Sequence, residues 1–344
     1  MKQIPTEQAV GHVLCHDITR IVKDQCKGVA FAKGHIVRQE DIPALLALGK
    51  DHLYVWEKQP GMLHENEAAE RLYALCAGAH VGPTAIKEGK ISCIAQTDGV
   101  LMIDVEKLHA INAIGEIIIA TQHSGFPVKK GEQLAAMRVI PLVIDEKKIA
   151  RAEAIMQGQT LLSVRPIHPK RAAVITTGNE VYHGRITDTF TPVIVEKLAE
   201  YGTLVQEHHL LPDDRAQITA AIEQSLANGA ELVLCTGGMS VDPDDVTPSA
   251  IRDTGAELVT YGAPVLPGAM FLIAYARKEG RTIPILGLPG CVMYARRTIF
   301  DLILPRVLAD VLVRAEDMAG MGHGGLCLDC PECTFPHCGF GKGR

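Results

Sequence analysis

Two glycines and three aspartates stand within the stretch TGGMSVDPDDVTP, residues 236–248. Gly237 and Gly238 allow backbone angles and a close ligand approach that other residues forbid. The carboxylates supply hydrogen-bond acceptors or hard oxygen ligands, which suit Mg²⁺ better than Zn²⁺; they belong to Asp242, Asp244 and Asp245. We therefore expect a ligand site here, with Mg²⁺ as a candidate metal.

Three further glycine turns share this character: TTGNE at residues 176–180, LPGA at 266–269 and GLPG at 287–290. Exposed backbone N–H groups and helix starts favour an anion such as a phosphate. The candidate ligand-binding residues in the four turns are Thr177, Gly178, Gly237, Gly238, Ser240, Asp242, Pro267, Gly268, Pro289 and Gly290. Each turn alone is weak evidence, whereas the ordered set is much stronger. Cys291, at a helix start, has either a lowered pKa and a ligand role or the role of an inert buried thiol.

A second candidate site is the cysteine-rich end of the chain, with the spacing Cys327-x2-Cys330-x2-Cys333-x4-Cys338. Four thiols within twelve residues can be aimed at one centre, which fits either tetrahedral Zn²⁺ or an iron–sulfur cluster. The first three cysteines resemble a bacterial ferredoxin run, but the last spacing is one residue longer. The glycine-rich approach to these thiols predicts a mobile docking arm.

The elements that must position the first site alternate between strand and helix from residue 169 to 314. Apolar strands are predicted at 171–176, 231–236 and 282–287, and helices at 215–228 and 291–309, with Thr247 as a helix N-cap. The pattern predicts an α/β domain with a doubly wound, mostly parallel sheet. Such sheets bind ligands at the carboxyl ends of their strands.

The rest of the chain predicts an N-terminal α+β and β-rich region and a Cys-rich tail. We expect four parts: a small α+β unit at 1–60, a mixed β-rich region with a linking helix at 61–168, the α/β domain at 169–314, and a metal-binding tail at 315–344. No nucleophile–base constellation is found between residues 89 and about 149.

Composition narrows the function classes. The chain has 344 residues and a formal net charge of −6, which gives no general reason to expect nucleic-acid binding. It has no apolar run of about 18 residues and no signal-peptide core, so we expect no membrane partner and a cytoplasmic location. The chain has ten cysteines. Because cytosolic thiols stay reduced, those that are clustered more often bind metal than form disulfides.

The order TGNE, ITDT, LPDD, TGGMSVDPDDVTP, PGA and GLPG is similar to the molybdopterin-binding domain of the molybdenum cofactor biosynthesis proteins. That family includes molybdopterin adenylyltransferase and molybdopterin molybdenumtransferase. The resemblance covers about residues 171–312. It implies that Gly237, Gly238 and Ser240 hold the pterin phosphate region, and it assigns candidate catalytic roles to Glu180, Asp188 and Asp245.

The departures from this pattern concern cations and amides. The molybdenumtransferase has PGKP where this chain has Ala269 and Met270, and GLPGNP where it has Cys291 and Val292; it usually has asparagine where this chain has Phe190. Losing a lysine and two amides weakens the case for molybdate insertion, whereas binding of molybdopterin or finished cofactor survives these changes better.

Three hypotheses follow. The first is a molybdopterin-binding protein of the cofactor pathway, either a molybdenumtransferase-like enzyme or a carrier that delivers cofactor to a client molybdoenzyme or pathway enzyme. The second is a non-enzymatic cofactor sensor or chaperone. The third is a competence-damage-type nucleotide hydrolase, against which the cysteine-rich tail and the N-terminal segments argue. The sequence does not decide whether the protein is an enzyme or a carrier, which metal the tail binds, which client enzyme it serves, or whether it forms a homo-oligomer.

Overall fold

The computed structural model describes residues 2–22, 26–55 and 60–343. The chain divides into two compact units, of which the first contains residues 1–96, 103–122 and 130–163, and the second residues 97–102, 123–129 and 164–344. The predicted four-part division stays a prediction. Its first boundary, near residue 60, adjoins residues 56–59, which lie outside the described residues.

The N-terminal part of the first unit has a small apolar core of its own. Its elements are β1 (Lys2–Pro5), β2 (Ile18–Val22), β3 (Cys26–Phe31), α1 (Ile42–Ala47) and β4 (His52–Val55). β1 pairs with β4, and β2 with β3, both antiparallel. β4 alternates between exposed and buried residues, so that Leu53 and Val55 join Leu14, Ile18 and Leu45 in the core.

The remainder of the first unit contains a four-stranded antiparallel sheet with the order β6-β7-β11-β9. The elements are β5 (Met62–His64), α2 (Glu65–Cys76), β6 (Val81–Pro83), β7 (Ile91–Ala95), α3 (Val105–Asn112), β9 (Ile117–Thr121), β11 (Gln133–Val139), β12 (Val143–Asp145) and α4 (Glu146–Met156). Arg71 joins α2 to α4 through a bidentate pair with Glu153, with N–O distances of 2.8 and 2.7 Å.

The second unit contains the α/β domain and most of a three-stranded sheet. The small sheet has the order β10-β8-β13, from Pro127–Val128, Gly99–Ile103 and Leu162–Pro166. The large sheet has the order β15-β14-β16-β19-β18-β17. Its strands are β14 (Arg171–Thr177), β15 (Leu204–Leu211), β16 (Leu232–Thr236), β17 (Glu257–Tyr261), β18 (Leu272–Lys278) and β19 (Arg281–Leu288). The four strands β15, β14, β16 and β19 pair in parallel, and β18 pairs antiparallel with both β19 and β17, which confirms the predicted mostly parallel sheet.

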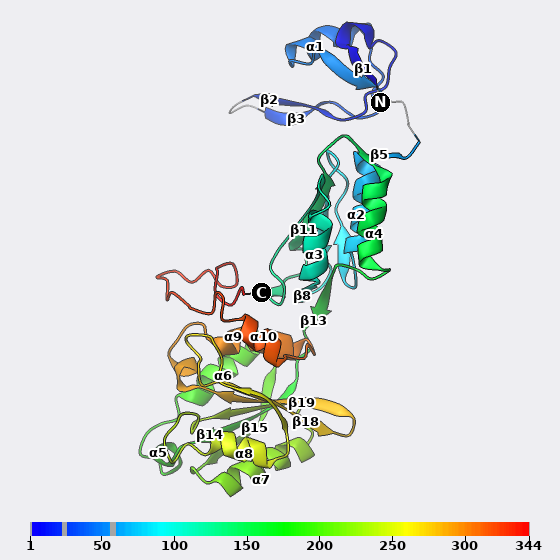
Figure 1. The fold of residues 1–344 in the computed structure, drawn as a ribbon. Coiled ribbons are helices and arrows are strands. Elements are labelled where there is room, and N and C mark those ends of the chain that lie inside the picture. Colours follow the sequence, from blue (N-terminus) through cyan, green and yellow to red (C-terminus); the bar gives the residue numbers. More distant parts are fainter. Residues whose placement is uncertain (1, 23–25, 56–59, 344) are drawn as a thin grey trace. The chain divides into compact units, whose positions relative to one another are not determined.

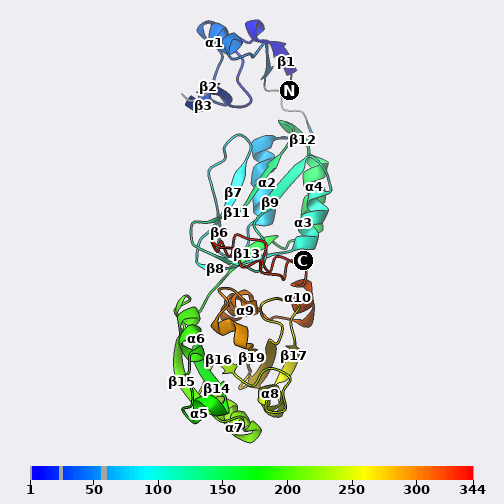
Figure 2. The same ribbon diagram turned by 90° about the vertical axis from the view of Figure 1, so that its left-hand side faces the viewer.

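Helices cover both faces of this sheet (Figures 1 and 2). They are α5 (Asn179–Tyr182), α6 (Phe190–Ala199), α7 (Arg215–Ala227), α8 (Thr247–Asp253), α9 (Ile299–Leu308) and α10 (Ala315–Gly320). Successive residues of β14 face opposite sides: Val174 packs with α6 and α9, whereas Ala173 and Ile175 pack with α7 and α8. The sheet is therefore doubly wound, as predicted.

Two helix predictions were wrong in detail. The helix expected at 291–309 is broken into a short 3-10 helix at Gly290–Met293 and α9. The break arises because Thr298 starts a new helix: its hydroxyl oxygen accepts the Phe300 N–H, and the Asp301 carboxylate accepts the Thr298 N–H at 2.7 Å. Thr247 is the first residue of α8 rather than its N-cap.

The tail after α10 differs from the expected mobile arm, because it packs against the α/β domain. Phe340 is 4% exposed and belongs to the same core as α9. Leu266 and residues 325–327 exchange two 2.8 Å backbone hydrogen bonds, from Leu266 N to Gly325 O and from Cys327 N to Leu266 O. The glycines serve close packing: a Cβ at Gly341 would lie 2.4 Å from the Leu302 side chain.

Within the described part of the chain, no helix is long and apolar enough to cross a bilayer.

Candidate functional site

A hollow of about 750 Å³ lies at the carboxyl ends of β16 and β19. It is the place where doubly wound sheets bind ligands. Eight of the predicted site residues line it: Gly237, Gly238, Ser240, Asp245, Pro267, Gly268, Pro289 and Gly290. The other lining residues are Phe190, Met239, Leu266, Ala269, Met270, Leu288, Cys291, Met293 and Tyr294. Three of the four predicted turns therefore meet around one space.

The glycine turn after β16 is fixed by hydroxyl groups from two other elements. Gly237 and Gly238 have φ values of +81° and +54°. The Thr247 hydroxyl donates to the Gly237 carbonyl at 2.9 Å and lies 3.3 Å from the Thr177 hydroxyl. A Cβ at Gly237 would lie 2.1 Å from the Thr177 carbonyl oxygen. Gly237 is thus required by its packing against β14.

The other glycines of the hollow divide into packed and open positions. A Cβ at Gly268 would lie 2.4 Å from the Ile299 side chain, so a larger residue would push α9 away. By contrast, a Cβ at Gly290 would meet no atom within 4 Å. Gly290 is therefore the lining glycine at which a side chain would enter free space without disturbing the fold.

The aspartate loop after this turn closes on itself. The Asp245 carboxylate accepts the Asp242 N–H at 2.9 Å, and the Asp245 N–H donates to the Asp242 carbonyl at 3.0 Å. The phenol of Tyr261 in β17 donates to the carbonyls of Met239 and Ser240, with O–O distances of 2.8 and 3.1 Å. Asp245 lines the hollow, whereas Asp242 is exposed and lies outside its lining.

Asp188 caps α6 beside the hollow. Its carboxylate accepts the N–H groups of Phe190 and Thr191 at 2.9 and 3.0 Å, and Phe190 lines the hollow. Burial alone would raise the pKa of Asp188, but the Thr191 and Phe190 hydrogen bonds and the nearby His208 bring the pKa below its usual value. His208 Nε2 lies 3.0 Å from the Thr176 hydroxyl.

The predicted residues of the TTGNE turn lie outside the lining of the hollow. Thr177 is buried and meets Thr247, Gly178 has a φ of +145°, and Glu180 is exposed in α5. The turn is tied to the next loop, because the Asn179 N–H donates to the Asp213 carboxylate at 2.9 Å. The structure thus places Thr177 as a support for the glycine turn, and the catalytic roles of Glu180, Asp188 and Asp245 stay predictions.

The lining of the hollow contains no lysine, arginine or histidine among the described residues. It is instead rich in sulfur, with Met239, Met270, Met293 and Cys291. Burial raises the pKa of the Cys291 thiol, despite a hydrogen bond with its own backbone, which favours the inert-thiol alternative. Phosphate groups in such a hollow would have to be held by backbone N–H groups rather than by cationic side chains.

Metal ligands do not converge in the part of the chain that the structure describes. No group of three or more histidine, cysteine, aspartate or glutamate side chains there is placed to hold a metal ion. The predicted Mg²⁺ at the aspartate loop is not supported by this arrangement. The four tail thiols do not surround one point, although Cys327, Cys330, Cys333 and Cys338 all line a second cavity.

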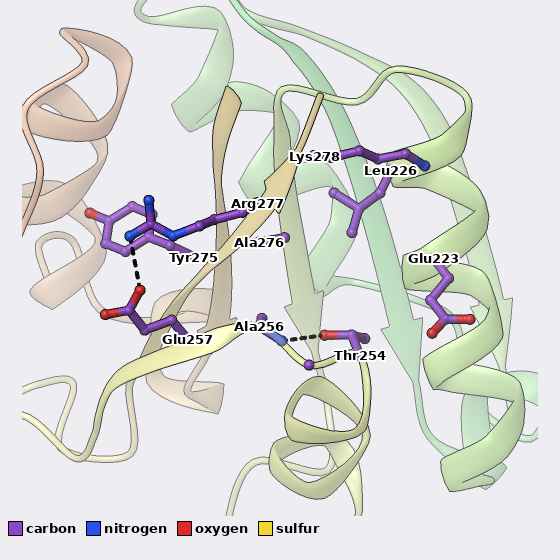
Figure 3. A pocket seen from close by; sticks show the side chains of 10 residues that line it. Glu223, Leu226, Thr254, Ala256, Glu257, Tyr275, Ala276, Arg277 and Lys278 are labelled. Atoms are coloured by element: carbon purple, nitrogen blue, oxygen red, sulfur yellow. Dashed lines mark hydrogen bonds and ion pairs between the residues drawn. The ribbon is translucent and has the colours of Figure 1, made fainter. Parts of the chain in front are cut away.

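A third hollow lies at the opposite edge of the sheet (Figure 3). It is lined by the ends of α7 and β18 and the start of β17, and its volume is about 580 Å³. Arg277 is paired with Glu257 at 3.1 Å, while Glu223 and Lys278 extend from the other side. None of the predicted site residues lines it, so it is not our candidate site.

Sequence reasoning missed the residues that hold the site from outside. Tyr261 and His208 lie on the edge strands β17 and β15, 22 and 32 residues along the chain from their partners Met239 and Thr176. The methionines that line the hollow do not follow any regular spacing in the sequence that would have marked them as site residues. In the structure, β15 alternates between exposed and half-buried residues, and His208 is at one of the exposed positions, so no burial pattern marks it.

A comparison with family models matches two segments. Residues 173–309 match the model described as "Probable molybdopterin binding domain". Residues 3–57 match a model described as "Domain of unknown function (DUF8806)".

Curated relatives match only parts of the chain. A molybdopterin molybdenumtransferase from Synechococcus elongatus is 26% identical over 159 residues, which cover 44% of this chain and 39% of the relative. A molybdenum cofactor biosynthesis bifunctional protein from the same organism is 36% identical over 85 residues, 25% of this chain and 27% of the relative. A CinA-like protein from Citrifermentans bemidjiense is 36% identical over 89 residues, 26% of this chain and 21% of the relative. The chain therefore spans less than half the length of these relatives.

Solved structures match a similar share of the chain. The molybdopterin biosynthesis enzyme MoaB from Thermus thermophilus is 25% identical, with a TM-score of 0.35, and the match covers 41% of this chain and 96% of that one. The protein CinA from Thermoplasma acidophilum is 21% identical, with a TM-score of 0.34, covering 40% of this chain and 98% of that one.

Proposed function

Since residues 173–309 belong to the molybdopterin-binding domain family of molybdenum cofactor biosynthesis, we propose that this chain binds molybdopterin, or the finished molybdenum cofactor, in the hollow at the ends of β16 and β19. The observation that carries the proposal is the convergence of three glycine turns on one space of about 750 Å³. That volume lies within the range of about 300–1,000 Å³ typical of small-molecule sites.

The chemistry of the lining suits the two ends of such a ligand. The apolar and sulfur-bearing side chains of Met239, Met270 and Met293 offer a surface for the flat pterin ring. Asp245 offers a carboxylate to the amino and ring N–H donors of the pterin. The open backbone around Gly290 is our candidate for the phosphate end, because glycine allows close approach, beside the Gly237–Ser240 turn to which the resemblance assigns it.

We further propose that the chain acts in maturation or delivery of the cofactor rather than in molybdate insertion. Transfer of an oxyanion is helped by cationic side chains that stabilise the developing charge. The described lining residues include no such cation. A carrier needs only binding and release, and its client would be a molybdoenzyme or a pathway enzyme in the cytoplasm. We also propose that the chain forms a homo-oligomer, and light scattering of the purified protein tests this.

A titration of the full chain with molybdopterin tests the binding proposal. Gly290→Val places a branched side chain at the open edge of the hollow, and we expect it to weaken binding at least tenfold without loss of stability. Gly28→Val is the matched control, because a Cβ there also meets no atom within 4 Å and the position lies in the N-terminal hairpin. Equal affinity in the two variants would contradict the assignment of the hollow.

The competence-damage-type hydrolase is the second candidate, and the CinA-like relatives favour it. It differs in substrate, since it would cleave a nucleotide. Incubation of the metal-supplemented chain with nucleotides, followed by chromatography of the products, separates the two. Turnover of a nucleotide without binding of molybdopterin would replace the first proposal by the second.

A further inference from the structure

A hollow of about 390 Å³ in the second unit is lined by residues of β8, of β13 and of the segment from the end of α9 into α10. Its charged lining residues are Arg165, Arg306, Asp310, Arg314 and Asp317. We call this space the arginine hollow. It shares no lining residue with the candidate cofactor site or with the cavity of the tail thiols. A ligand there would therefore occupy a site of its own.

Arg306 is the fixed point of the arginine hollow. It is half-buried in the last turn of α9, and its Nε donates to the Gly125 carbonyl at 3.1 Å. A Cβ at Gly125 would lie 2.4 Å from Arg306 Nη2, so the glycine leaves the space that the guanidinium fills. In the described part of the chain, neither Nη1 nor Nη2 of Arg306 has a hydrogen-bond acceptor. The guanidinium is thus held in place while four of its five N–H donors remain for a ligand.

The positive charge of Arg306 is also without a close counter-charge. Among the described residues, no carboxylate oxygen lies within 4.0 Å of the guanidinium nitrogens of Arg165, Arg306 or Arg314. Burial lowers the pKa of Arg306, and the more distant Asp317 offsets this only in part. Because a desolvated charge without a partner is unfavourable, an anion bound in the hollow would stabilise it.

The two carboxylates of the arginine hollow are already engaged. Asp310 is paired with Lys170, which lies outside the lining, at 2.6 Å. The Asp317 carboxylate accepts the Arg314 N–H at 2.8 Å, at the start of α10. Three guanidinium groups therefore line the hollow together with a single carboxylate that has no cationic partner. This leaves an excess of positive charge that suits a doubly charged anion.

We propose that the arginine hollow binds a small organic phosphate. Planar guanidinium groups donate paired hydrogen bonds to phosphate oxygens, and a phosphate monoester carries up to two negative charges. The remaining lining residues, Met102, Val311 and Leu312, offer an apolar surface to the carbon part of the ligand. The volume falls within the range of about 300–1,000 Å³ typical of small-molecule sites. This proposal does not depend on the proposed function, because the two sites share no residue.

Isothermal titration of the full chain with phenyl phosphate at low ionic strength tests the proposal. We expect saturable binding that weakens about tenfold in Arg314→Gln, which alters an exposed side chain and should keep the fold. Arg306→Lys keeps the charge but loses the planar pair of donors, so it should weaken binding as well. Arg277→Gln, at an exposed arginine outside the hollow, is the matched control and should keep the wild-type affinity. Benzoate, with the same ring and one negative charge, should bind about tenfold more weakly than phenyl phosphate.

Three results would overturn the proposal. One is no saturable binding of phenyl phosphate by the folded wild-type chain, another is equal affinity in Arg314→Gln and Arg277→Gln, and the third is benzoate binding as tight as that of phenyl phosphate. Folding of each variant is checked by hydrogen exchange of β16. Molybdopterin is titrated into the same variants: Arg314→Gln should retain pterin binding, and Gly290→Val should retain phenyl phosphate binding. Failure of this proposal and failure of the cofactor proposal are therefore read separately.

Discussion

Replacing Gly237 by alanine probes the contact on which the candidate site is built. Two costs act at this position. The φ of +81° is unfavourable for alanine by about 1–2 kcal/mol. In addition, the new Cβ would lie 2.1 Å from the Thr177 carbonyl oxygen, and relief of such overpacking costs about 1–3 kcal/mol.

Gly255→Ala separates these two costs. Gly255 has a similar φ of +73°, but a Cβ there meets no atom within 4 Å. Both variants therefore carry the cost of the backbone conformation, and only Gly237→Ala adds the contact with β14. The difference between them should be about 1–3 kcal/mol, which corresponds to about 5–150-fold in an opening equilibrium.

Hydrogen exchange of the β14 and β16 amides measures this difference directly. We expect the slowest amides of these strands to exchange about 5–150-fold faster in Gly237→Ala than in Gly255→Ala. Molybdopterin binding should be weakened in Gly237→Ala as well, because the turn lines the hollow. Exchange rates that agree within about twofold would refute the claim that the Thr177 contact fixes the turn.

Three other predictions concern the supports of the site. Asp188→Ala should destabilise α6 by about 0.5–2 kcal/mol at neutral pH. Because the pKa of Asp188 is lowered in the folded state, its stabilising effect is present above the unfolded-state pKa of about 3.9 and is lost as the pH falls through the folded-state pKa. Urea denaturation at several pH values should therefore show the difference in stability between wild type and variant disappear in acid. A stability difference between wild type and Asp188→Ala that stays constant into strong acid would contradict this prediction. Tyr261→Phe removes the hydroxyl that donates to the Met239 and Ser240 carbonyls, and should lower the free energy of unfolding by about 0.5–1.5 kcal/mol. Hydrogen exchange in the aspartate loop should become faster. Unchanged stability and exchange would show that the phenol does not stabilise the loop. Asp301→Asn leaves the buried Lys197, whose ammonium lies 2.7 Å from the Asp301 carboxylate, without its counter-charge, and should cost about 3–5 kcal/mol in thermal unfolding. Asp253→Asn, at an exposed pair, should have little effect, and similar melting temperatures of the two variants would argue against the buried pair.

Local sequence signals predicted the sheet and most of the hollow. Buried apolar runs such as 171–176 and 231–236 define strands because both faces of a parallel sheet are covered. Glycine turns that follow such strands must meet at one edge, which placed Gly238, Asp245 and Gly290 around a common space. These inferences needed only neighbouring residues and the rules of sheet topology.

The rest depended on contacts between distant segments. The tail glycines predicted mobility, but Gly341 is small because α9 passes beside it, a fact that no local pattern contains. The same holds for Gly237, whose neighbour is the Thr177 carbonyl from another strand. The predicted helix at 291–309 was too long, because the prediction followed the apolar spacing and overlooked the capping pair of Thr298 and Asp301.

The most direct test of the central claim is pterin retention by the full chain. The protein is purified without oxygen, divided, and one half is incubated with molybdopterin and desalted; both halves are then oxidised and their extracts are measured for pterin fluorescence. We predict about one pterin per chain in the incubated half, and a loss of most of it in Gly290→Val. No pterin in either half of a folded wild-type protein would contradict the account and would direct the search to a nucleotide ligand.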